Sequence, residues 1–191
     1  EEAAAAKKTA PQKWKLAEEM GEESLVRFLE EHKAGTLKPF FKSEEPPASQ
    51  DGPVTVVVGS TFDAIVLDPT KDVLLEVYAP WCQHCQALAP IWEKLARRFA
   101  PVESVVIAKI DGTANEHSSI ADVGGFPAIY LFPAGADKQR VDHAEDDESA
   151  RTLAGFTKWL KANAQVPYEL KKKAAPASDA ADVSGATKDE L

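Results

Sequence analysis

Two cysteines separated by only two residues are the side chains of this chain best suited to chemistry. They are Cys82 and Cys85, and the 191 residues contain no other cysteine. A pair at this spacing can cycle between a dithiol and a disulfide and can exchange disulfides with another polypeptide. A disulfide-stapled scaffold would carry more cysteines at longer spacings, and a four-ligand zinc site would need a second ligand pair. We therefore favour a redox-active pair without a metal, and an inert local disulfide is the alternative.

The residues around the pair predict which sulfur attacks. An apolar run at 72–79 is typical of a buried strand, and a helix is expected from Cys82 to about Phe99. Cys82 then lies at a helix N-terminus, where free N–H groups and the helix dipole favour a thiolate anion. Cys85 follows one turn later and can resolve a mixed disulfide, while a protonated His84 would stabilise the Cys82 thiolate. Because this stabilises the reduced form, we expect the loop to donate disulfides.

Two charged residues interrupt strands that should be dry. Glu76 lies within the run 72–79, and Lys109 lies within the next predicted strand, 105–110. Burying an unpaired carboxylate is costly and raises its pKa. We predict that the two residues pair beneath the dithiol and that Glu76 accepts the proton of Cys85 before that thiol attacks. The alternative is that one or both face a solvated edge of the sheet.

A Gly-Gly-Phe-Pro turn at 124–127 precedes the predicted strand 128–132. A proline at the entry to a sheet marks a tight turn and permits a cis bond before Pro127. Such a bond would place the backbone of Phe126 and Pro127 beside the sulfurs, where an extended substrate can add as a strand. Trp81 is predicted to contact substrate as well, with packing at the helix start as the alternative.

The elements that must hold these residues alternate between strand and helix. Strands are expected at 54–58, 72–79, 105–110, 128–132 and 141–143, and helices at 60–67, 82–99, 116–123 and 149–162. Alternation early in the chain and a hairpin late in it predict an α/β fold, in which a central mixed sheet is flanked by helices.

The flanking segments differ in composition from this core. Residues 1–12 are alanine-rich, and an amphipathic helix is expected from residue 22 to about residue 37, with an apolar face that needs a partner. The Pro, Ser and acid-rich stretch 42–52 predicts a linker. After Tyr168 large apolar residues are scarce, so that stretch cannot offset its ordering entropy and is predicted to be disordered.

The overall charge and hydropathy exclude some classes of protein. A formal net charge of -9 argues against binding to nucleic acids or anionic membranes, because both partners are polyanions. No apolar run approaches the length that spans a bilayer. The chain begins neither with Met nor with a cleavable signal, so we expect a processed or excised piece.

Several segments together resemble the protein disulfide isomerase family. They are YAPWCQHC, LAPIWEKLA, VIAKID, the GFP turn and the final KDEL. The resemblance is to the C-terminal catalytic domain and implies a thioredoxin-like fold over 53–165. It also implies that residues 1–41 end a preceding non-catalytic domain, that 42–52 is a linker, and that 166–191 is a tail with an endoplasmic-reticulum retrieval signal.

The resemblance also implies a role for each matching residue. These roles are nucleophile for Cys82, resolving cysteine for Cys85, proton-transfer carboxylate for Glu76, its partner for Lys109, and cis-proline for Pro127. Arg151 falls where the family has an arginine that moves toward the resolving cysteine. Two departures from the pattern stand out. An acidic stretch, 145–149, replaces the usual Tyr-x-Gly-x-Arg approach, and Gln83 replaces a glycine and could shift the redox potential.

The acidic run 145–148 has its own predicted roles. We expect it to complement the dipole of the closing helix and to pair with Arg151, in the first turn of that helix. Weak calcium binding is the alternative.

The function implied is the formation and rearrangement of disulfides in unfolded or misoxidised client proteins of the endoplasmic reticulum lumen. The chain would be part of a larger, multidomain isomerase. The expected cofactor is the Cys82–Cys85 disulfide alone, with glutathione or an oxidase as redox partner and the KDEL-retrieval receptor as a further partner. Two alternatives are a chaperone module with an incidental redox centre and a cytosolic-type reductant, which His84 and the KDEL end oppose.

Overall fold

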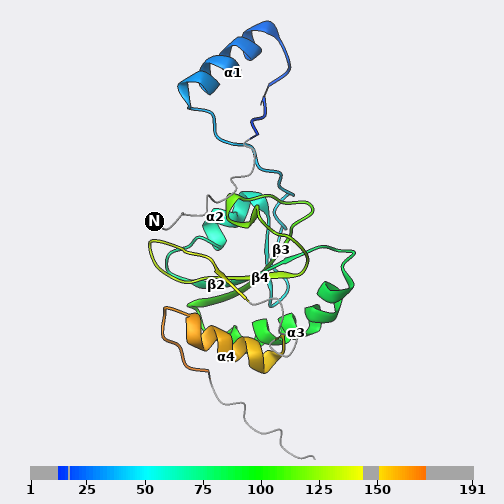
Figure 1. Cartoon of the computed structure of the whole chain (residues 1–191), viewed down its shortest axis with the longest axis vertical. Coiled ribbons are helices and arrows are strands. Elements are labelled where there is room, and N and C mark those ends of the chain that lie inside the picture. Colours follow the sequence, from blue (N-terminus) through cyan, green and yellow to red (C-terminus); the bar gives the residue numbers. More distant parts are fainter. Residues whose placement is uncertain (1–12, 17, 144–150, 171–191) are drawn as a thin grey trace, which may run out of the picture.

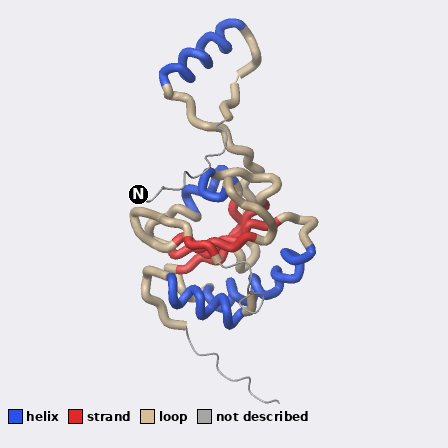
Figure 2. The backbone as a smooth tube through the Cα atoms, viewed as in Figure 1, coloured by secondary structure: helices blue, strands red, loops and turns tan. Residues whose placement is uncertain are grey.

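The strands of the described residues, which are 13–16, 18–143 and 151–170 of the computed structural model, form one mixed sheet (Figures 1 and 2). They are β1 (Thr55–Val57), β2 (Asp72–Tyr78), β3 (Val105–Asp111), β4 (Ala128–Phe132) and β5 (Val141–Asp142), in the order β1-β3-β2-β4-β5. The first three strands are mutually parallel, and β4 and β5 join antiparallel at the other side. The predicted α/β fold with a mixed sheet is confirmed.

Helices cover both faces of this sheet. The described residues form α1 (Glu22–Ala34), the 3-10 turn η1 (Gly59–Thr61), α2 (Phe62–Ile65), α3 (Gln83–Phe99), the 3-10 turn η2 (Ser118–Ile120) and α4 (Leu153–Asn163), of which α2, η2, α3 and α4 pack on the sheet. One core lies under α3 and α4, where Trp92 and Phe156 pack edge to face with ring centroids 5.3 Å apart. A second core lies under α2 and η2 and contains Phe62 and Ile120. No described helix has the length and apolar character needed to cross a membrane.

Strand β2 separates these two cores. Leu74 belongs to the core under α3 and α4, and Leu75 belongs to the core under α2. Successive side chains of a strand point to opposite faces, so a strand with a core on each side needs an almost continuous apolar run. This explains why the sequence predicts β2 so closely and why a charge within it is conspicuous.

Several helices differ in extent from the sequence prediction, and two of them have ends set by local capping. The helix predicted at 60–67 is found as η1 followed by the shorter α2. Helix α1 ends at Ala34, because Gly35 adopts a left-handed conformation with φ 68° and closes the helix. Helix α4 begins at Leu153 and not at residue 149, because the Thr152 hydroxyl accepts the N–H of Gly155 at 3.0 Å. The helix predicted at 116–123 is wrong in extent, since only the short η2 forms there.

Helix α1 stands apart from the sheet (Figure 1). Leu25, Val26 and Leu29 on this helix, and Met20 before it, are exposed. Its apolar face therefore has no cover among the described residues, in keeping with the expectation that it needs a partner.

The segment predicted as a linker is hydrogen-bonded to the sheet domain over residues 42–50, which we call the strap. The Lys42 carbonyl accepts the N–H of Glu116 at 2.8 Å. The buried Asn115 side chain accepts the Glu44 N–H at 2.9 Å and donates to the Glu44 carboxylate at 2.7 Å. The Gln50 amide both accepts from and donates to the backbone of Val56 at 2.9 Å, and so covers that point of the β1 edge.

Asp72, at the start of β2, joins three distant parts of the chain. Its fully buried carboxylate accepts backbone N–H groups from Ala134 at 2.8 Å and from Gln165 and Val166 at 2.9 Å. These bonds connect β2 to the turn after β4 and to the segment after α4. The sequence places Asp72 only at the edge of an apolar run and does not predict this role.

An Asp72→Ala variant is expected to lose about 2–3 kcal/mol of unfolding free energy, because three buried N–H groups lose a charged acceptor. Urea unfolding followed by tryptophan fluorescence measures the change. The matched control is Asp137→Ala, which removes an exposed carboxylate bonded to Gln139. If both variants unfolded at the wild-type urea concentration, Asp72 would not hold these segments together.

Candidate active site

The two thiols lie at the junction of β2 and α3. Cys82 is the N-cap residue of α3, and its N–H donates to the Ala79 carbonyl at 3.0 Å. Its sulfur accepts the N–H of Cys85 at 3.2 Å. A sulfur in this position faces the free N–H groups of the first helical turn, which stabilise an anion. The structure therefore places Cys82 where the sequence predicts the nucleophile, and both cysteines are free thiols.

The second thiol, Cys85, is hard to ionise. Cys85 is 4% exposed. Burial, and next its hydrogen bond with Cys82, raise the pKa of Cys85 to about 12. At neutral pH Cys85 therefore holds its proton, and a base is needed before it can attack a mixed disulfide.

Glu76 has the burial and the raised pKa that the predicted proton acceptor would need. It is 3% exposed on the central strand, so the alternative that it faces a solvated edge is wrong for this residue. Burial raises the pKa of Glu76 to about 7, and the charge of Lys109 opposes part of that rise. Glu76 is also near enough for its charge to raise the pKa of Cys85 further. A carboxyl that titrates near neutrality can accept and return a proton.

Lys109 lies directly opposite Glu76 in the parallel register of β2 and β3. Its ammonium group lies 5.7 Å from the centroid of the Tyr78 ring. Both side chains belong to the described residues, and they form no direct ion pair with each other. The predicted pairing is therefore an electrostatic attraction between two residues that lie opposite each other on neighbouring strands, without a direct ion pair. Lys109 itself is only half-buried.

The turn before β4 brings a backbone edge to the Cys82 sulfur. The Phe126–Pro127 peptide bond is cis, as predicted. The Phe126 carbonyl oxygen lies 3.5 Å from the Cys82 sulfur. Trp81 is 71% exposed, and its ring meets the Phe126 ring edge to face at 6.0 Å. The predicted substrate-facing residues therefore gather around one sulfur.

Gly112 contributes to this arrangement without being predicted from the sequence. A Cβ atom at this position would lie 2.7 Å from the Val77 side chain and 2.8 Å from the Phe126 ring. Only a residue without a side chain lets the ring lie so close to the end of β2. A glycine directly after the strand VIAKID is the sole local signal.

The remaining predicted residues are less closely engaged. Gln83 and His84 are exposed on the first turn of α3, and the role of His84 stays a prediction. Arg151 is half-buried and precedes α4, so its placement within the first helical turn was wrong. Its predicted acidic partners, 145–148, lie outside the described residues, as do residues 1–12 and the KDEL end. Within the described part of the chain, no group of three or more His, Cys, Asp or Glu side chains could hold a metal.

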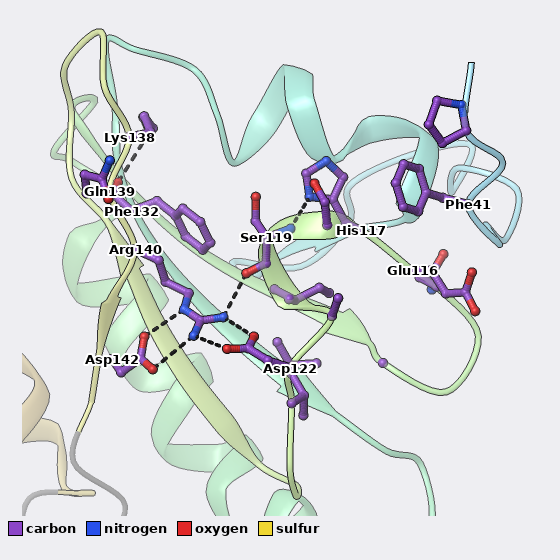
Figure 3. Close-up of a pocket in the computed structure, with 18 of the residues that line it drawn as sticks. Phe41, Glu116, His117, Ser119, Asp122, Phe132, Lys138, Gln139, Arg140 and Asp142 are labelled. Atoms are coloured by element: carbon purple, nitrogen blue, oxygen red, sulfur yellow. Dashed lines mark hydrogen bonds and ion pairs between the residues drawn. The ribbon is translucent and has the colours of Figure 1, made fainter. Parts of the chain in front are cut away.

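A cavity of about 1120 Å³ opens on the face of the sheet that α2 and η2 cover (Figure 3). It lies between the loop after β3 and the β4–β5 hairpin. Val77, Gly112 and Phe126 line one part of it, so it borders the residues that support the dithiol. No sequence motif predicts this cavity.

Comparisons with known proteins agree with this geometry. The Thioredoxin family matches residues 53–160. Protein disulfide isomerase-like 1-4 of Arabidopsis thaliana is 45% identical over 168 residues, which are 88% of this chain and 28% of that protein. Protein disulfide-isomerase of Humicola insolens is 44% identical over 167 residues, which are 86% of this chain and 31% of that protein. The chain thus spans less than a third of the length of these relatives.

A solved structure supports the same fold. The first thioredoxin domain of mouse Protein disulfide-isomerase A4 superposes with a TM-score of 0.50 and 28% sequence identity. The superposition covers 70% of this chain and 94% of that domain.

Proposed function

The chain belongs to the thioredoxin family, and on that premise we propose that it forms and rearranges disulfide bonds in client proteins through the Cys82–Cys85 dithiol. The observation that carries the proposal is a pair of buried thiols, one of which caps a helix while the other has a raised pKa and feels the charge of a buried carboxyl. Cys82 meets the helix N-terminus, while Cys85 and Glu76 have raised pKa values. This separates the two sulfurs into an attacking and a resolving group.

Disulfide formation follows from this separation. A client thiolate attacks the sulfur of Cys82 in the Cys82–Cys85 disulfide, and Cys85 leaves as a thiolate. A second client thiolate then attacks the client sulfur of the mixed disulfide, and Cys82 leaves reduced. Glutathione or an oxidase is the proposed source of renewed Cys82–Cys85 disulfide, with no metal or organic cofactor.

Disulfide rearrangement uses the reduced pair. The Cys82 thiolate attacks a wrong client disulfide and forms a mixed disulfide. When the client does not resolve it, Glu76 takes the proton of Cys85, and the Cys85 thiolate displaces the client sulfur and closes the Cys82–Cys85 disulfide. Lys109 is proposed to stabilise the ionised carboxylate, while His84 and Arg151 are proposed to stabilise the thiolates of Cys82 and Cys85.

Client binding is proposed to use the backbone edge beside the nucleophile. An extended client segment would lie along Phe126 and Pro127, with Trp81 covering it. The 3.5 Å approach of the Phe126 carbonyl to the Cys82 sulfur supports this, since a segment paired there brings its own sulfur within reach.

The proposed setting is the lumen of the endoplasmic reticulum, with the KDEL end read by its retrieval receptor. We further propose that residues 1–41 end a preceding non-catalytic domain in a longer isomerase. The greater length of the relatives and the uncovered apolar face of α1 support this.

A redox titration against glutathione tests the proposed direction of exchange. The dithiol is expected to have a potential of about −180 mV, in the range of disulfide donors, and the chain is expected to reactivate a scrambled, disulfide-containing enzyme. A potential near that of a dedicated reductant, about −270 mV, would contradict the proposal. A control with both thiols alkylated should show no reactivation.

A further inference from the structure

The loop between β3 and β4, residues 112–127, delivers the Phe126 carbonyl to the Cys82 sulfur. The part of the loop directly before Phe126 has little packing around it. A Cβ atom at Gly124 or Gly125 would meet no heavy atom within 4 Å. On one side the Phe126 carbonyl is positioned by the packing of the Phe126 ring near Val77 and Gly112, and on the other side by the point where the loop is held before these glycines.

Arg140, on the β4–β5 hairpin, forms hydrogen bonds with the loop at Ser119 and Asp122, before the two glycines (Figure 3). Its guanidinium donates to both carboxylate oxygens of Asp122, at 2.6 and 2.8 Å. It also donates to the Ser119 carbonyl at 2.9 Å. Two bonds from the same group, at 2.7 and 3.1 Å, reach Asp142 on β5. The guanidinium thus connects the loop to the hairpin across one edge of the cavity.

This arrangement differs from an ordinary surface ion pair. The Arg140 side chain is 20% exposed, and its guanidinium carbon lies 4.2 Å from the centroid of the Tyr130 ring. Bidentate, partly buried pairs fix orientation far better than exposed pairs, whose side chains move freely. The guanidinium is thus held against the ring, and both carboxylate oxygens of Asp122 are bonded to it.

We propose that Arg140 is a positioning residue that, through Asp122, holds the Phe126 carbonyl where a polypeptide substrate must pair. It touches neither substrate nor sulfur. Its loss should weaken the binding of a client segment and leave the attack of a small thiol reagent on Cys82 unaffected. This inference rests on the proposed thiol–disulfide exchange and adds a determinant of polypeptide affinity to it.

Asp122 and Asp142 form a matched pair for the test. Both bond to the same guanidinium, and each side chain is 58% exposed, so neither substitution threatens folding. Only Asp122 lies on the loop that carries Phe126. The experiment compares Arg140→Gln, Asp122→Asn and Asp142→Asn in the full chain, oxidised at the dithiol.

Oxidation of a dithiol peptide, measured over a range of peptide concentrations with glutathione disulfide present to reoxidise the Cys82–Cys85 pair, gives KM and kcat for each variant. Arg140→Gln and Asp122→Asn are expected to raise KM about five- to tenfold, and the double variant no further, because the two residues act as one unit. Asp142→Asn should stay within about twofold of the wild type. The reaction of each reduced variant with a small aromatic disulfide should proceed at the wild-type rate.

Two results would overturn the inference. One is an unchanged KM for Arg140→Gln and Asp122→Asn. The other is an equal rise in KM for Asp142→Asn, which would indicate a general loss of order in the hairpin. An inability of the wild-type chain to oxidise the peptide would instead refute the proposed function, so the two failures are distinguishable.

Discussion

A Cys85→Ser variant is expected to accumulate as a mixed disulfide with its clients, whereas a Cys82→Ser variant is expected to form none. With Cys82 intact, the first attack proceeds, but the sulfur that closes the internal disulfide is missing. With Cys82 replaced, the thiol at the helix N-terminus is lost, and turnover should fall by roughly a thousandfold or more, to the uncatalysed rate. Non-reducing electrophoresis and mass spectrometry of the trapped species measure both outcomes.

The control for this experiment is Lys94→Ser, which changes an exposed side chain of α3 and keeps both thiols. It should turn over normally and trap no client. Normal turnover by Cys82→Ser would refute the assignment of the nucleophile, and the absence of mixed disulfides in Cys85→Ser would refute the assignment of the resolving thiol.

Replacing Glu76 by glutamine is expected to stabilise the fold above neutral pH. Burial raises the pKa of Glu76 from 4.5 to about 7, so folding favours the neutral carboxyl. The stability from this group is complete below pH 4.5 and is lost as the pH rises through 7. At pH 8 the ionised form costs about 3 kcal/mol relative to a neutral side chain. Urea unfolding of both proteins at pH 4 and pH 8 measures the difference.

The same Glu76→Gln variant should slow the release of clients. Cys85 keeps its proton at neutral pH, and glutamine cannot accept it, so closure of the internal disulfide should slow about a hundredfold. The first attack by Cys82 should be unchanged, because it does not involve Cys85. Stopped-flow measurement of the two steps separates them, and an equal slowing of both would contradict the role of Glu76 in proton transfer.

Much of the fold can be predicted from the sequence because its central strands are buried on both faces. The apolar run of β2 ends within one residue of its predicted end, and β4 has the predicted bounds, 128–132. Helix ends are harder to predict, since capping by Thr152 depends on a single local bond, although Gly35 was expected to help end α1 and does so. Glu76 could also be found from the sequence, because it is a charged residue inside the continuous apolar run that predicts β2.

The polar residues that hold the site together could not be found in this way. Asp72, Asn115 and Arg140 are polar residues at ordinary strand ends and in loops, and their partners lie up to 94 residues away. No periodicity marks such long-range bonds. His84 is predicted from the dithiol motif, but its exposed position leaves its role to experiment.

The hydrogen bonds of the strap determine where a force applied to the chain before the sheet domain would first be resisted. The Thioredoxin family match begins at residue 53, yet Asn115 and Glu116 bond to residues that precede it. A pull on the chain from the side of α1 would therefore be resisted first at Lys42 and Glu44, and not absorbed by a loose tether. Asn115 and Glu116 belong to the same loop as Phe126. Tension from the neighbouring segment thus reaches the first half of this loop, before the point where Arg140 bonds to Ser119 and Asp122.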